Sequence, residues 1–161
     1  TRVRSSAASD VYKRQVDGSV AHPLSLSMDD LKALPMASQV SDFHCVEGWG
    51  VNDVRWQGVR LQTLLDLAQP ANVDYITFHS LDGVYKDSLT MAQAAYPDVL
   101  LAYNMYERPL PPRHGLPLRL IVPHMYGYKG PKWLTRVEFT AKQDTGYWEE
   151  RGWQVDGWLH S

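Results

Sequence analysis

The stretch "LPPRHGLPLRLIVPHMYGYKGPKWLTRVEF", residues 110–139, is the most informative part of this chain about its fold. Its apolar run "LRLIV", residues 118–122, is typical of a central strand buried on both faces. A loop rich in glycine and lysine follows, and "WLTRVEFTA", residues 133–141, then alternates like a half-buried strand. The stretch therefore predicts two strands joined by a basic loop. One face of the second strand is predicted to carry Trp133, Thr135, Val137 and Phe139.

Outward from this stretch, short helical segments are scattered among strands. Asp17-Gly18 is a hairpin turn signal, and residues 27–35 predict a helix capped by Ser27 and ended by Pro35. Because the helices are too short and too few to cover both faces of a parallel sheet, we predict an α+β fold with mixed, mainly antiparallel sheets. The other predicted helices lie in residues 60–70, with Leu61, Leu64, Leu65 and Ala68 on one face, and 90–97; the other predicted strands lie in 38–46, 74–80, with Ile76 and Phe78 buried, and 99–105.

Length and composition favour a single globular domain. The chain has 161 residues, of which 44% are hydrophobic, and its net charge is -2. No basic surface is expected that would bind nucleic acid, and no apolar run is long enough to span a bilayer. Residues 1–15 are polar, basic and without periodicity, so we interpret them as a disordered arm or a non-native scar. Residues 16–161 then form the domain.

The chain has one cysteine, Cys45, in "DFHCVEGWGV", residues 42–51. A single cysteine excludes an internal disulfide. Two interpretations stay open from the residue alone, namely a small buried hydrophobe and a thiol kept for its reactivity or its metal affinity. A zinc site is not favoured, because the histidines and this cysteine show no H-x-x-x-H or C-x-x-C spacing.

Arg119 stands inside the apolar run "LRLIV". A guanidinium there is costly unless an anion meets it, so it contacts a ligand, pairs with a carboxylate such as Glu138, or lies on an exposed face. The following loop, "GYKGPKW", residues 127–133, combines glycines with lysines. Such a loop can hold a phosphate or be an ordinary solvated turn.

Three segments resemble the molybdopterin domain of the sulfite oxidase family. They are "HCVEGW", residues 44–49, the pattern W-x-G-V-x-L-x-x-LL, residues 56–65, and the stretch 110–139. The closer resemblance is to the bacterial branch, which includes the periplasmic methionine-sulfoxide reductase catalytic subunits. It runs from about Val16 to the C-terminal "GYWEERGW". The resemblance implies the sulfite oxidase molybdopterin-domain fold.

The resemblance also implies a set of site residues. The family cysteine that ligates molybdenum matches Cys45, and an acid near the metal matches Glu47, so these two are the catalytic candidates. A soft thiolate suits this metal. The cofactor-binding candidates are Phe43 and His44, which precede the ligand, Ser80, His114, Arg119, and the loop residues Lys129, Gly130, Pro131 and Lys132.

The expected cofactor is therefore Mo-molybdopterin, and the expected activity is oxygen-atom transfer on a small S- or N-oxide-type substrate. No C-x-x-C-H haem motif is present, so electrons are expected to be exchanged with a separate carrier such as a membrane cytochrome. The resemblance implies a periplasmic location, and a cytoplasmic one otherwise.

Two other functions remain as alternatives. The family's upstream segment rich in Asn and Tyr is replaced here by residues 1–15, which motivates a non-catalytic ligand- or partner-binding domain of the same fold. The other is a thiol enzyme with Cys45 as nucleophile and His44 or His114 as base. The thiol enzyme ranks last, because adjacent residues on a strand point to opposite faces, and His44 is then badly placed to activate Cys45. Sulfite is not favoured as substrate, because a doubly charged anion needs converging arginines. The only candidates are Arg55, Arg60, Arg108 and Arg113, and the sequence does not place them at the metal.

Overall fold

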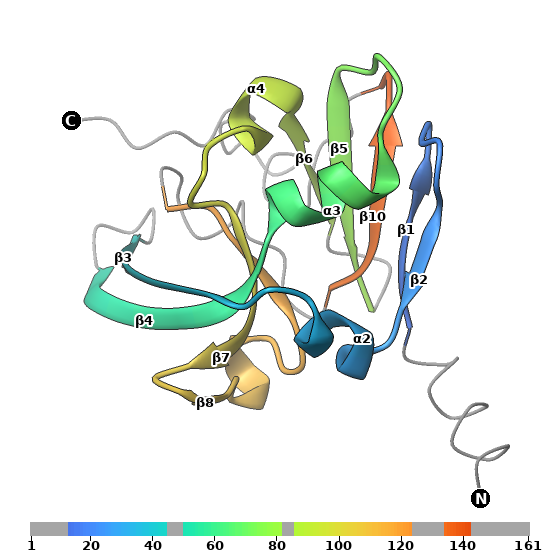
Figure 1. Ribbon diagram of the computed structural model, residues 1–161. Helices are drawn as coiled ribbons and strands as arrows, with labels where there is room; N and C mark the ends of the chain where they lie inside the picture. The colour runs from blue at the N-terminus through green and yellow to red at the C-terminus, as the bar shows by residue number, and fades with distance from the viewer. Residues whose placement is uncertain (1–12, 45–49, 82–85, 124–133, 143–161) are drawn as a thin grey trace, which may run out of the picture.

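The computed structural model describes residues 13–44, 50–81, 86–123 and 134–142. Two sheets form its framework (Figure 1). The first has the strand order β2-β1-β10-β5-β6, and the second has the order β3-β4-β7-β8, with β9 pairing to β7. Among the described residues, only β1 and β10 pair in parallel. The α+β class with mixed, mainly antiparallel sheets is thereby confirmed.

The strands of the first sheet are β1 (Arg14–Gly18), β2 (Leu24–Leu26), β5 (Tyr75–Ser80), β6 (Lys86–Thr90) and β10 (Leu134–Thr140). Those of the second are β3 (Ala37–His44), β4 (Gly50–Arg60), β7 (Leu100–Met105), β8 (Arg108–Pro109) and β9 (Arg119–Ile121). The short helices are α2 (Met28–Ala33), α3 (Leu61–Ala68), α4 (Met91–Ala94) and the 3₁₀ turn η1 (Pro112–His114).

The main hydrophobic core includes side chains from both sheets and from α3. The predicted apolar face of α3 is confirmed, because all four of its residues are buried. Ile76 and Phe78 of β5 are also fully buried, as predicted. Each such leucine or phenylalanine contributes about 1.5–3 kcal/mol relative to leaving it exposed. Packing rather than helix length therefore stabilises these short elements.

Local capping defines the start of α2. The Ser27 hydroxyl accepts from the backbone N–H of Asp30 at 3.0 Å, and the Asp30 carboxylate accepts from the Ser27 N–H at 3.0 Å. This reciprocal pair satisfies two N–H groups that the helix leaves unbonded. The predicted Ser27 cap is confirmed.

The first hairpin differs from its predicted turn. Asp17 and Gly18 end β1 instead of forming the turn, and residues 19–23 connect β1 to β2. Gly18 has φ +86, and a Cβ there would lie 2.3 Å from the carbonyl oxygen of Phe139. The glycine is therefore needed for the close approach of β1 to β10.

The predicted alternation in β10 is wrong at its start. The pairing of β10 with β5 shifts register between Leu134 and Arg136, so Leu134 joins Val137 and Phe139 in the core while Thr135 is half-buried. An irregularity of this kind changes which face successive side chains occupy. Trp133 lies outside the described residues.

Among the helices that the structure describes, none has the length and apolar character to cross a membrane.

Candidate functional site

Arg119, the first residue of β9, has an exposed fraction of only 1%. Its Nη1 donates to the carbonyl oxygen of His114 at 3.3 Å, and its guanidinium carbon lies 5.7 Å from the centre of the Trp56 ring. Burial lowers the pKa of Arg119 to about 10, so the side chain still carries its charge at neutral pH. An exposed Arg119 was one of the sequence alternatives, and it is wrong.

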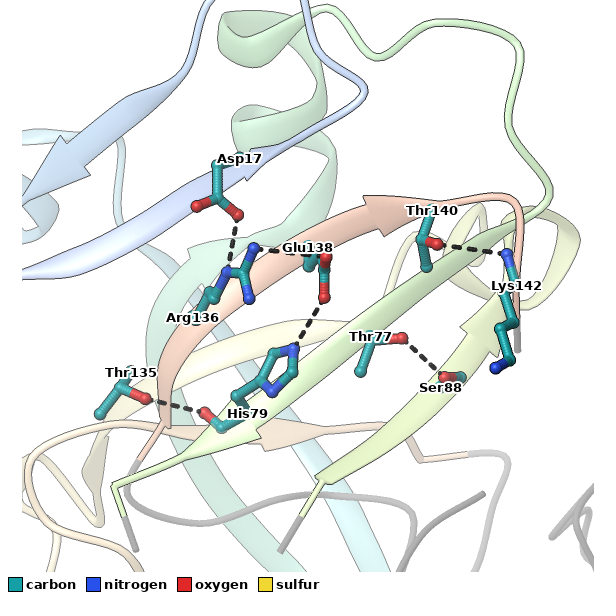
Figure 2. A network of polar contacts seen from close by, with 9 residues as sticks. All are labelled: Asp17, Thr77, His79, Ser88, Thr135, Arg136, Glu138, Thr140 and Lys142. Atoms are coloured by element: carbon teal, nitrogen blue, oxygen red, sulfur yellow. Dashed lines mark hydrogen bonds and ion pairs between the residues drawn. The ribbon is translucent and has the colours of Figure 1, made fainter. Parts of the chain in front are cut away.

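The second alternative, an Arg119–Glu138 pair, finds no support, because Glu138 contacts other groups. Its carboxylate lies 3.0 Å from His79 Nε2 and 3.3 Å from Arg136 Nη2, while Arg136 Nε donates to Asp17 at 2.8 Å. Figure 2 shows this chain of contacts across β1, β10 and β5. Glu138 therefore belongs to a network on the first sheet.

The local fold explains why Arg119 is buried. Arg119 pairs with Ala102 of β7, and the next residue, Leu120, packs into the main core. Ile121 faces the other way, into a second apolar cluster that contains Trp56. Because residues two apart on a strand share a face, the Arg119 side chain lies on the same face as Ile121. The guanidinium therefore lies on the face of the sheet that carries the second apolar cluster.

Ser80 ends β5 in the other sheet, and only 3% of its surface is exposed. It pairs with Leu134 of β10, whose N–H donates to the carbonyl oxygen of Leu118 at 2.9 Å. Leu118 immediately precedes Arg119 in the sequence. The structure therefore brings the strand ends carrying Ser80 and Arg119 together, although they come from different sheets.

The remaining site candidates are placed only in part. Phe43 and His44 end β3, opposite Val51 and Gly50 at the start of β4. Cys45 therefore directly follows the last residue of a described strand. His114 ends η1, is half-buried, and contributes its backbone oxygen to Arg119. The candidates outside the described residues are Cys45, Glu47, Lys129, Gly130, Pro131 and Lys132, and their roles remain predictions.

Two of the four arginines considered for sulfite make other contacts. Arg55 forms an ion pair with Glu107 at 3.1 Å, and Arg60 Nη1 donates to Gln39 at 3.2 Å. Arg108 and Arg113 are exposed on β8 and η1. These partners of Arg55 and Arg60 do not include Arg119.

Trp56 is a site residue that residue-by-residue reasoning missed. It is 2% exposed and belongs to the pattern W-x-G-V at residues 56–59, which carried only a family resemblance. Gly58 in the same pattern lets β4 approach β7, because a Cβ there would lie 2.0 Å from the carbonyl oxygen of Leu101. In this sheet, the tryptophan of the pattern is therefore explained by burial and its glycine by the close approach of two strands.

A family model described as the oxidoreductase molybdopterin binding domain matches residues 2–148. The chain belongs to this family. The matched range includes most of residues 1–15. The predicted boundary at residue 15 is wrong, because Arg14 and Gln15 belong to β1 and Arg14 is buried. Residues 1–12 lie outside the described residues, so their interpretation as an arm remains a prediction. The domain is an oxidoreductase domain of the sulfite oxidase superfamily, as the resemblance implied.

Three curated relatives are similar over most of this chain. The uncharacterized oxidoreductase YuiH of Bacillus subtilis is 40% identical over 91% of this chain and 74% of its own length. The protein-methionine-sulfoxide reductase catalytic subunit MsrP of Campylobacter jejuni is 34% identical, over 86% of this chain and 52% of its own length. For the putative protein-methionine-sulfoxide reductase subunit YedZ1 of Azospira oryzae the identity is 35%, over 91% and 55% respectively. The chain thus spans about half the length of the latter two.

A solved structure confirms the fold. The sulfane dehydrogenase SoxCD from Paracoccus pantotrophus superposes with a TM-score of 0.76 at 22% identity, covering 84% of this chain and 39% of that one. At this identity the likeness concerns the fold alone.

The described residues fit a molybdopterin. That cofactor carries a phosphate and a polar pterin, and the strand ends at the junction of the two sheets present a buried cation, Arg119, and a buried hydroxyl, Ser80. A buried guanidinium is favourable when an anion and hydrogen-bond acceptors meet it. The donor set therefore matches the family's cofactor in charge and in hydrogen bonding.

Proposed function

We propose that this chain is the catalytic domain of a molybdenum-cofactor oxidoreductase that removes an oxygen atom from a small S-oxide, with a sulfoxide as the first candidate. The observation that carries the proposal is the buried Arg119 at the junction of the two sheets, in a chain of the molybdopterin-binding family. Two relatives at 34% and 35% identity are named as methionine-sulfoxide reductase subunits, which supports a sulfoxide over other oxides.

In this proposal the chain's own residues have separate tasks. Cys45 supplies a thiolate, since coordination removes the thiol proton outright. Arg119 and Ser80 bind the polar and anionic parts of the cofactor, together with Phe43, His44, His114 and the loop Lys129–Lys132. When bound, the cofactor supplies two-electron oxygen-atom transfer, while the protein positions and tunes it.

Sulfoxide reduction consumes an electron pair and two protons and releases a sulfide and water. We assign to the carboxyl of Glu47, close to the ligand in sequence, the delivery of protons to the departing oxygen. In this proposal the electrons come from a separate carrier, which is supported by two relatives that are named as subunits of a methionine-sulfoxide reductase. A membrane cytochrome that passes electrons to this domain in the periplasm fits this role.

The test begins with metal analysis. The protein is produced in a molybdenum-competent host, and its molybdenum and pterin contents are measured by mass spectrometry and by fluorescence of the oxidised pterin. We expect one metal per chain and sulfoxide reduction with a reduced viologen dye. Cys45→Ser is expected to abolish turnover while the circular dichroism spectrum stays unchanged.

The matched control is Ser41→Ala, which alters the same strand β3 but no proposed ligand. It is expected to keep both metal and turnover. Wild-type protein without metal would contradict the proposal, as would full activity in Cys45→Ser. Stoichiometric metal without turnover of any S- or N-oxide would instead favour the non-catalytic binding domain.

A further inference from the structure

Arg119 and Trp56 lie on strands that flank the same neighbour. Gly58 of β4 pairs with Ala102 of β7, and Ala102 pairs with Arg119 of β9. This row across three strands therefore carries no side chain at the first position and a single methyl group at the second. Trp56 lies two residues from Gly58 on the same face of β4, so only the Ala102 methyl group stands on β7 between the strand of the indole and the strand of the guanidinium.

The indole of Trp56 occupies that face. Its ring centre is 5.7 Å from the Arg119 guanidinium carbon, within the range of an attractive cation–π contact. Trp56 is itself 2% exposed and packed with Val54, Leu100 and Ile121, so its ring has one fixed orientation. The carbonyl oxygen of His114 accepts from Nη1 at 3.3 Å. A planar, delocalised guanidinium stacks on aromatic faces in a way that an ammonium does not reproduce.

We propose that Trp56 is a positioning residue, whose indole fixes the plane of the Arg119 guanidinium so that this cation meets an anionic group of the bound cofactor. This inference rests on the proposed function, because it concerns the same cofactor. Trp56 acts through Arg119, and makes no demand on the metal or the substrate. Its loss is therefore expected to weaken cofactor retention.

The experiment is a double-mutant cycle on cofactor retention. Trp56→Leu, Arg119→Met and the double variant are produced in the molybdenum-competent host, and the rate of pterin loss on dilution is measured by fluorescence. We expect Trp56→Leu to speed the loss on the order of tenfold, as a desolvated cation–π contact predicts. We expect no further increase when Arg119→Met is already present.

Two controls separate positioning from packing. Trp56→Phe keeps an aromatic face and is expected to restore most of the cofactor retention. Val54→Ala makes a cavity in the same cluster and strand, and is expected to leave cofactor retention unchanged. Turnover per bound molybdenum is expected to be the same in Val54→Ala and the wild type. Trp56→Phe also keeps the test valid if Trp56→Leu fails to fold.

The outcomes are distinguishable. Wild-type protein that binds no cofactor overturns the proposed function, and this inference with it. A loaded wild type overturns the inference alone if Trp56→Phe is no better than Trp56→Leu. The same holds if Trp56→Leu and Arg119→Met have independent, multiplicative effects, or if Val54→Ala speeds cofactor loss as much as Trp56→Leu does.

Discussion

At the scale of single residues, the charge on Asp30 makes a measurable contribution to the stability of the fold. The hydrogen bond from the Ser27 N–H, followed by that involving the Ser27 side chain, lowers the pKa of the Asp30 carboxyl from its ordinary 3.8. Because the folded-state pKa is depressed, the carboxylate contributes stability above the ordinary value. That contribution is lost as the pH falls through the folded-state value.

We predict that Asp30→Asn lowers the free energy of unfolding by about 0.3–1 kcal/mol at neutral pH, the usual value of a charge at a helix start. The difference from wild type is expected to disappear as the pH is lowered below 3.8, in urea unfolding followed by circular dichroism. Asp29→Asn removes a charge from the same turn but no capping bond, so the loss in Asp30→Asn beyond that in Asp29→Asn measures the charged capping bond. A difference that persists unchanged in acid would contradict the assignment.

Residue patterns of short range were readable from the sequence. Ser27 caps a helix that begins at the next residue, by a hydrogen bond to a residue three positions on, and the apolar face of α3 repeats within eight residues. Arg119 was recognised as a costly charge, but its contact with Trp56 could not be predicted, because β4 and β9 are far apart in the chain. The role of Cys45 came only from family resemblance, since one thiol has no local pattern.

At the scale of elements, Gly18 shows why a correct hairpin had an incorrect turn. The Asp17-Gly18 signal is local, whereas the need for a glycine arises from Phe139 on β10, a strand that lies late in the sequence. The register shift after Leu134 is a similar case, because it depends on pairing with β5. Tertiary contacts decided both positions.

Gly18→Ala is expected to lower the free energy of unfolding by about 1–3 kcal/mol, because the added Cβ meets the Phe139 carbonyl in a left-handed conformation. Gly18→Asn separates the two causes. Asparagine tolerates positive φ but adds the same Cβ, so it is expected to be as damaging as alanine. Ser19→Ala, at the next exposed position, is the control. Recovery of wild-type stability in Gly18→Asn would show that conformation, not contact, decides.

At the scale of the whole molecule, cofactor binding and folding are linked. A ligand that binds only the native state raises stability, by about 2.7 kcal/mol at a hundredfold excess over Kd. In the proposed site, an anion of the cofactor offsets the desolvation cost of the buried Arg119 charge. A cofactor-free protein should therefore be less stable than a loaded one.

We predict that the loaded protein melts about 5–10 °C above protein made in a host that cannot synthesise molybdopterin. Differential scanning calorimetry at equal protein concentration measures the two midpoints. Arg119→Met is expected to narrow the gap, because one partner of the cofactor is lost. Equal midpoints for loaded and cofactor-free wild type would refute the linkage.

The parallel pairing of β1 with β10 has a consequence for synthesis. β1 pairs with β2 soon after both are made, but its other edge pairs with β10, where Gln15 lies beside Arg136. That second edge stays unpaired until nearly all of the described chain has left the ribosome. Pairing between such distant segments forms late, because loop closure must precede it. The nascent domain therefore stays open along this edge of β1 until β10 has been made, and the first sheet is completed only then.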